Sequence, residues 1–162
     1  MDAFQDLTCE GILKLIEEGA NVNEKDEYEY TPLYYACRND YKNVVSILLE
    51  KGANVNEKSK CGYTPLHCAC YNGYGRIVSI LLEKGANVSE KNNGGRTPLD
   101  YAYWSGRTNI IEILLDNGTE VEYNEEGKIV YDMDQIFYRC RDKMKKFFDN
   151  YIPKSSYFKP AK

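Results

Sequence analysis

The sequence predicts an all-α solenoid in which stacked helix-turn-helix units are joined by hairpin loops. Thr-Pro-Leu occurs three times, beginning at Thr31, Thr64 and Thr97, at intervals of 33 residues. Aligning residues 31–63 with residues 64–96 gives 21 identities in 33 positions. Self-similarity at a period of this length is the sequence signature of a repeat architecture, in which each unit packs only on its neighbours.

The period also sets the expected organisation of the chain. Full repeats are predicted at 31–63, 64–96 and 97–129. Residues 1–30 form an N-terminal cap, because the segment that begins at Gly19 lies 33 residues before the matching segment at Gly52 but follows no Thr-Pro-Leu. An apolar stripe from Met133 to Tyr151 predicts a capping helix over 130–152, followed by a flexible tail over 153–162.

Each full repeat is expected to contain two helices. In the first repeat, Thr31 can cap a short helix and Pro32 suits the first helical position, so this helix is predicted over 32–39. The second helix is predicted over 42–51 and is apolar nearly all round. Asp40 occupies the turn between them, where the second repeat has Gly73, and we expect a left-handed backbone at this residue.

The 33-residue period, the string TPLHCA at 64–69 and the ending LLEKGANV at 81–88 resemble the ankyrin repeat, and the resemblance covers about residues 7–128. It implies a non-enzymatic module that binds another protein on a concave face, formed by the loop tips and the exposed sides of the first helices. The matching variable positions are Tyr28, Tyr30, Arg38, Lys60, Tyr63, Tyr71, Asn72, Arg96 and Trp104. Aromatic residues and arginines at such solvent-facing positions are typical of interaction hot spots. The alternative is an accident of composition, since the chain has 15 tyrosines.

Composition narrows the range of partners. The net charge is −4 and the isoelectric point is near 5.2, so no basic field favours binding to nucleic acid. The sequence contains no apolar run of the length that a membrane span or a signal peptide needs. We therefore expect a monomeric intracellular protein, in the cytoplasm or the nucleus, whose six cysteines are reduced.

A metal or redox site is the remote alternative. His67 is the only histidine, and Cys61, Cys68 and Cys70 lie within ten residues of one another around it. The spacing argues against a zinc site, because adjacent helical residues such as His67 and Cys68 project about 100° apart. In the ankyrin resemblance, the histidine of TPLH instead hydrogen-bonds backbone groups of neighbouring loops. We expect no metal and no cofactor, and the chain lacks a recognisable catalytic motif.

Two further hypotheses concern other segments. The ankyrin resemblance implies that Asn23 and Asn56 match asparagines that a hydroxylase can modify, although the same residues can simply satisfy backbone groups in a turn. Arg139, Arg141, Lys143, Lys145 and Lys146 accompany the apolar stripe near the C-terminus. Such a basic amphipathic helix could dock on a membrane surface or on a partner, as the alternative to capping the repeat stack.

Overall fold

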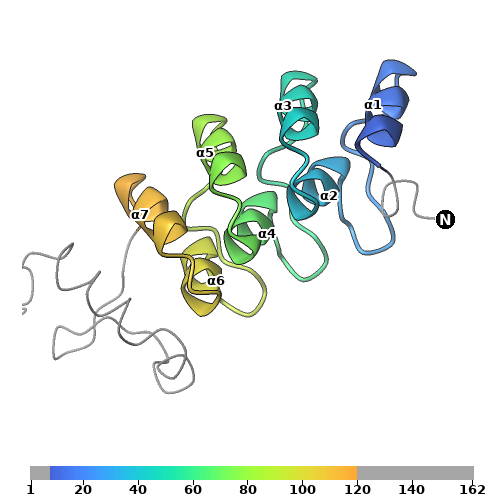
Figure 1. Ribbon diagram of the computed structural model, residues 1–162. Coiled ribbons are helices and arrows are strands. Elements are labelled where there is room, and N and C mark those ends of the chain that lie inside the picture. The colour runs from blue at the N-terminus through green and yellow to red at the C-terminus, as the bar shows by residue number, and fades with distance from the viewer. Residues whose placement is uncertain (1–7, 120–162) are drawn as a thin grey trace, which may run out of the picture.

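Seven helices in two rows make up the part of the chain that the computed structural model describes, residues 8–119 (Figure 1). The outer row consists of α1 (Cys9–Glu17), α3 (Lys42–Glu50), α5 (Gly75–Glu83) and α7 (Thr108–Asp116). The inner row consists of α2 (Pro32–Arg38), α4 (Pro65–Asn72) and α6 (Pro98–Trp104). Residues 8–119 include no strand. This arrangement confirms the predicted all-α repeat solenoid.

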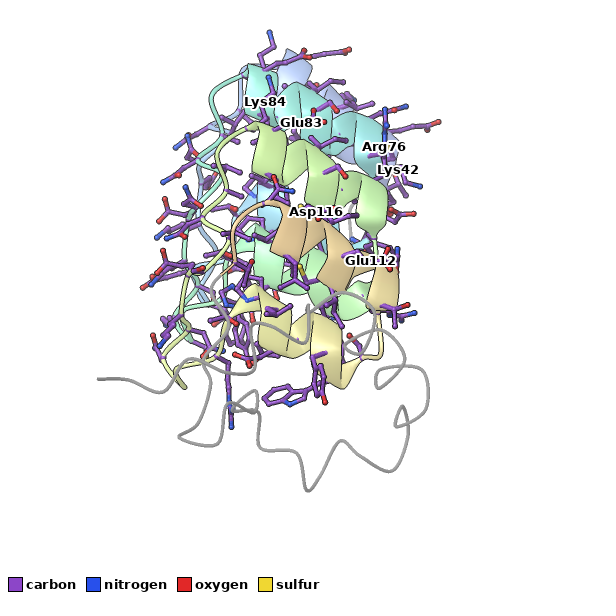
Figure 2. The ribbon with its side chains drawn as sticks, turned by 90° about the vertical axis from the view of Figure 1, so that its left-hand side faces the viewer. Lys42, Arg76, Glu83, Lys84, Glu112 and Asp116 are labelled. Carbon is purple, nitrogen blue, oxygen red and sulfur yellow. The ribbon has the colours of Figure 1, made fainter. Side chains whose placement is uncertain are left out.

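The helices keep the 33-residue register of the sequence. The outer helices begin at Cys9, Lys42, Gly75 and Thr108, and the inner helices begin at Pro32, Pro65 and Pro98. Loops formed by residues 20–31, 53–64 and 86–97 project beyond the inner row (Figure 1). We call these loops, together with the exposed sides of α2, α4 and α6, the loop face. Charged residues such as Arg76 and Glu112 instead lie on the outer helices (Figure 2).

The core is a strip between the two rows, built from the same positions in each repeat. The inner helices contribute one leucine each and small residues such as Ala36 and Ala69, which allow close approach between neighbouring units. The outer helices α3, α5 and α7 each bury three aliphatic side chains: Val44, Val45 and Leu48; Ile77, Val78 and Leu81; Ile110, Ile111 and Leu114. Complete burial of one such side chain contributes about 1.5–3 kcal/mol.

One detail of the outer helices differs from expectation. In the sequence, apolar residues occupy nearly every side of these helices. In the structure, Ile47 and Leu49 of α3 are only half-buried, as are Ile80 and Leu82 of α5. An outer helix has another outer helix beside it and inner helices beneath it, so its remaining side faces solvent. The apolar positions on that side are therefore only partly covered.

The helix starts and turns follow from local chemistry. The Thr31 hydroxyl accepts a hydrogen bond from the Tyr34 backbone N–H at 3.3 Å, as expected of a helix cap. Asp40 has φ +58°, which confirms the left-handed turn predicted between the helices of the first repeat. Gly73 takes φ +82° at the equivalent turn of the second repeat.

Several sequence predictions lie outside the described residues. They are the end of the third repeat at residue 129, the capping helix over 130–152, the basic run from Arg139 to Lys146 and the tail over 153–162. Among the helices of residues 8–119, none has the length and apolar character that a membrane crossing requires.

Candidate functional site

The loops that support the candidate site are joined to one another by two asparagines. Asn23 accepts a hydrogen bond from the backbone N–H of Asn54 at 2.8 Å and donates one to the carbonyl of Gly52 at 3.1 Å. Asn56 makes the same pair of bonds one repeat later, to the N–H of Asn87 at 2.7 Å and the carbonyl of Gly85 at 3.1 Å. Asn23 and Asn56 therefore bridge repeats, beyond satisfying a local turn.

Ion pairs also join each loop to the next one. Lys25 lies 2.7 Å from Glu57, and Lys58 lies 2.6 Å from Glu90. The hydrogen bond from Lys25 lowers the pKa of the Glu57 carboxyl, and the hydrogen bond from Lys58 does the same for Glu90. These side chains are partly exposed, so each pair contributes no more than about 1 kcal/mol. Their main effect is to fix the position of adjacent loops.

His67 is a buried structural residue. Its Nδ1 accepts a hydrogen bond from the Thr64 N–H at 3.2 Å, and its Nε2 lies 3.0 Å from the carbonyl of Arg96. A backbone N–H only donates and a carbonyl only accepts, so the ring is the neutral tautomer with its proton on Nε2. Burial lowers the pKa of His67, in agreement with this neutral form. The predicted role in bonding neighbouring loop backbone is confirmed.

An aromatic cluster on the loop face joins the third repeat to the two repeats before it. The Tyr63 hydroxyl lies 2.8 Å from that of Tyr101, and the ring of Tyr101 is within 6.2 Å, centroid to centroid, of Tyr71 and within 5.2 Å of Trp104. The Arg96 guanidinium carbon lies 4.9 Å from the centre of the Trp104 ring, which is a cation–π contact. Burial and the Tyr63 hydrogen bond raise the pKa of Tyr101 to about 12.

The predicted binding residues divide into two groups by exposure. Five are exposed: Tyr28, Arg38, Lys60, Tyr71 and Trp104. Four are half-buried: Tyr30, Tyr63, Asn72 and Arg96. The whole set is expected at solvent-facing positions, and the second group is only partly exposed. Those four side chains lie against neighbouring side chains or backbone of the same chain, and this contact covers part of their surface.

The half-buried tyrosines have internal partners. Tyr30 stacks on Tyr34 with ring centres 4.1 Å apart, and Tyr63 is bonded to Tyr101. Asn72 donates a hydrogen bond to the carbonyl of Cys68 at 2.9 Å. These side chains support the loop face, whereas Tyr71 and Trp104 stand out from it.

Sequence reasoning missed Tyr101, the residue that contacts most members of the cluster. It occupies the position of Tyr35 and Cys68 in the preceding repeats, where both residues are buried. That equivalence predicts a core residue. The available signal was the density of aromatic residues in Tyr101, Tyr103 and Trp104, since repeats one and two each have only one aromatic residue at the same three positions.

The cysteines around His67 do not form a site with it. In residues 8–119, no group of three or more His, Cys, Asp or Glu side chains is placed to hold a metal ion. Cys9, Cys37, Cys61, Cys68 and Cys70 are free thiols. Burial raises the pKa of Cys37 and Cys70, so these thiols stay protonated and unreactive at neutral pH.

Comparison with known proteins agrees with the repeat architecture. A family model described as ankyrin repeats, in three copies, matches residues 3–59 and 52–125. The two matches together span well over half of the 162 residues. No curated protein matches the chain.

Proposed function

We propose, given that this chain belongs to the ankyrin-repeat family, that it is a non-enzymatic module which binds a protein partner on its loop face. Ankyrin repeats are general protein–protein interaction modules and are typically non-enzymatic. The finer parts of the proposal are the face that is used and the residues that anchor the partner. Binding of this kind acts by recruiting the partner or by masking part of its surface.

The observation that carries the proposal is the location of the exposed aromatic residues. Within residues 8–119 the large apolar side chains that are exposed are Tyr28 at 51 %, Tyr71 at 55 % and Trp104 at 39 %. Tyr28 lies in a loop, and Tyr71 and Trp104 lie at the ends of inner helices. The outer helices, which make up the opposite side of the stack, contribute none of the three.

Exposed aromatic residues on a fixed support suit a contact surface. Tyr and Trp bury a large area on binding and lose little conformational freedom, and they are enriched among hot spots. Tyr101 contacts both Tyr71 and Trp104 and helps to hold their rings in place before binding. A rigid anchor costs less entropy on association than a mobile one.

The test is quantitative affinity capture from lysate of the native host with three forms of the full chain. The forms are wild type, Tyr71→Ala/Trp104→Ala, and the outer-face control Arg76→Ala/Glu112→Ala, whose side chains lie on α5 and α7 (Figure 2). We expect specific partners to be recovered by wild type and by the control, and depleted at least about tenfold by the aromatic variant.

Thermal unfolding of all three forms shows whether folding is preserved. If the folded aromatic variant recovers every partner that wild type recovers, the assignment of binding to the loop face is wrong. If the outer-face variant alone loses the partners, the binding surface lies on the outer helices.

A further inference from the structure

We propose that the loop face of the second and third repeats takes an acidic peptide segment of the partner, with carboxylates on either side of an apolar anchor. This inference rests on the proposed function and specifies the chemistry of the segment that is bound. It follows from how charge is distributed around Tyr71 and Trp104, which differs from the overall charge of the chain. The net charge of −4 would by itself favour a basic partner.

Within residues 8–119, four cations on or beside this part of the loop face have no ionic partner. They are Arg38, Lys60, Arg96 and Arg107, and none belongs to the five ion pairs found among residues 8–119. Three of them are exposed, and Arg96 is half-buried against Trp104. An approaching carboxylate can therefore reach them without first breaking an ion pair of the described structure.

The carboxylates of the same region already have partners. Glu57 is paired with Lys25, and Glu90 is paired with Lys58. Asp100 accepts hydrogen bonds from the backbone N–H and the hydroxyl of Thr97 at 2.6 and 3.0 Å. The second and third loops and helices α4 and α6 contain no further Asp or Glu. The available charge in this region is positive.

Two of these cations lie close to the exposed aromatic residues. Arg96 lies over Trp104, and the Arg107 side chain passes directly over Gly73, two residues after Tyr71. Arg38 occupies in α2 the position that Tyr71 occupies in α4, and its charge partly offsets the rise that burial causes in the pKa of Cys68 on α4. An arginine from the preceding repeat and one from the following repeat therefore lie near the C-terminal half of α4, which carries Tyr71.

The first loop limits where an acidic segment can lie. Residues 20–31 contain Glu24, Asp26, Glu27 and Glu29 against the single cation Lys25, which is paired with Glu57. Like charges across an interface oppose binding and select against the wrong register. An acidic segment is thus directed to the second and third repeats, and a basic residue of the partner would suit the first loop.

Basic and aromatic side chains also occur together in proteins that bind single-stranded nucleic acid. Here the acidic first loop and the net negative charge oppose a polyanion that is longer than the patch. A short peptide with a few carboxylates fits the limited extent of the positive region better. Binding of an oligonucleotide is therefore an outcome that the experiment must exclude.

The experiment is a selection of random 12-residue peptides displayed on phage against the purified full chain. We expect the recovered sequences to be enriched in Asp and Glu around an aromatic or aliphatic residue. For the most enriched peptide, Arg38→Ala/Arg96→Ala should weaken the Kd by about tenfold or more. The charge-matched outer-face variant Arg76→Ala/Lys84→Ala, whose residues are labelled on and just after α5 in Figure 2, should change it less than about threefold.

A second peptide separates the contribution of the peptide's charge to binding from the contribution of its shape. The same peptide with Asn and Gln in place of Asp and Glu should bind about tenfold more weakly, and raising the salt concentration should weaken the acidic peptide preferentially. Arg96→Ala removes only a side chain, so the backbone carbonyl that receives the His67 hydrogen bond remains. Thermal unfolding of each variant checks the fold.

The outcomes distinguish this inference from the proposed function. Neutral or basic peptides whose binding depends on Tyr71 and Trp104 would overturn the acidic specificity while supporting the loop face as the binding site. Peptides that bind independently of Tyr71 and Trp104, or recovery of none, would overturn both. Tighter binding of oligouridylate than of any peptide, lost in Arg38→Ala/Arg96→Ala, would replace the peptide by nucleic acid.

Discussion

The Nε2 of His67 donates a hydrogen bond of 3.0 Å to the carbonyl of Arg96, the last residue of the second repeat. His67, in the first turn of α4, is thereby joined to the loop that leads into the third repeat. The Arg96 side chain lies over Trp104, so the same backbone position connects the structural histidine with the proposed binding surface. Repeat packing and the geometry of the surface are coupled at this point.

The buried histidine predicts a pH dependence of stability. Folding lowers the pKa of His67 from its ordinary value near 6.5, so the unfolded chain binds a proton more readily than the folded chain. The free energy of unfolding is therefore highest above pH 6.5 and falls as the pH is lowered toward 5. Urea unfolding at several pH values between 5 and 7.5 measures this slope.

The control for this prediction is His67→Gln. Glutamine at this helix position can maintain a capping interaction but does not titrate. Because His67 is the only histidine in the chain, the slope between pH 5 and 7.5 should be smaller in this variant than in wild type. Equal slopes in the two proteins would show that other groups cause the pH dependence.

Alanine substitutions at two glycines with similar backbone conformations should lower stability by different amounts. Gly62 and Gly95 have φ of +79° and +75°, so alanine is strained by about 1 kcal/mol at both positions. A Cβ at Gly62 would also lie 2.6 Å from the side-chain oxygen of Asn93, whereas a Cβ at Gly95 meets nothing within 4 Å. Gly62→Ala should therefore lower the unfolding free energy by about 1 kcal/mol more than Gly95→Ala does. Equal losses by urea denaturation would exclude close packing of the loops at Gly62.

Asn56 should contribute more to stability than an exposed asparagine. Asn56→Ala removes two hydrogen bonds to the next loop, and we expect a loss of about 1–3 kcal/mol in unfolding free energy. Asn43 is exposed on α3, so Asn43→Ala should change stability by less than about 0.5 kcal/mol. Urea denaturation compares the two variants. A loss below 0.5 kcal/mol for Asn56→Ala would contradict the bridging role.

The hydroxylation hypothesis for Asn23 and Asn56 has a separate test. Both amide groups are held by the next loop, so a modifying enzyme would have to separate adjacent loops before it reached an extended segment. The intact mass of protein from the native host would increase by one oxygen for each modified residue. An unchanged mass would exclude the modification and leave the bridging role.

Alanine substitutions at Tyr63 and Tyr71 should differ in how much they lower the stability of the fold. Tyr63 is half-buried and bonded to Tyr101, so Tyr63→Ala should lower the unfolding free energy by about 2 kcal/mol. Tyr71 is 55 % exposed, so Tyr71→Ala should cost less than about 1 kcal/mol. Thermal or urea unfolding checks both values. If Tyr63→Ala is as stable as wild type, the Tyr63–Tyr101 contact does not support the surface.

Much of the local structure could be predicted from the sequence because it depends on neighbouring residues. Thr31 followed by Pro32 predicts where α2 begins, and Asp40 in the position of Gly73 predicts a left-handed turn. These features involve residues only a few positions apart. The role of His67 was also predictable, but only through the resemblance to ankyrin repeats, since one of its partners is the carbonyl of Arg96, 29 residues away.

The exposure of the candidate binding residues was less predictable. Tyr63 and Tyr71 both occupy variable positions of the repeat pattern, yet the first is bonded to Tyr101 and the second is exposed. The contact between Tyr63 and Tyr101 joins residues 38 positions apart. The repeat pattern describes each unit by its own consensus, so it does not state which variable side chains of adjacent units meet.

By itself the sequence determined the repeat, its register and its helices, because a 33-residue period repeats the same local signals and the same buried positions. Only the tertiary structure decided how the loop face is composed. Stacking brings Tyr101 of the third repeat against Tyr63 and Tyr71 of the two preceding repeats, and leaves Arg38, Arg96 and Arg107 without ion pairs in the described residues. Burial and charge pairing depend on distances across repeats, which residue identity alone does not fix.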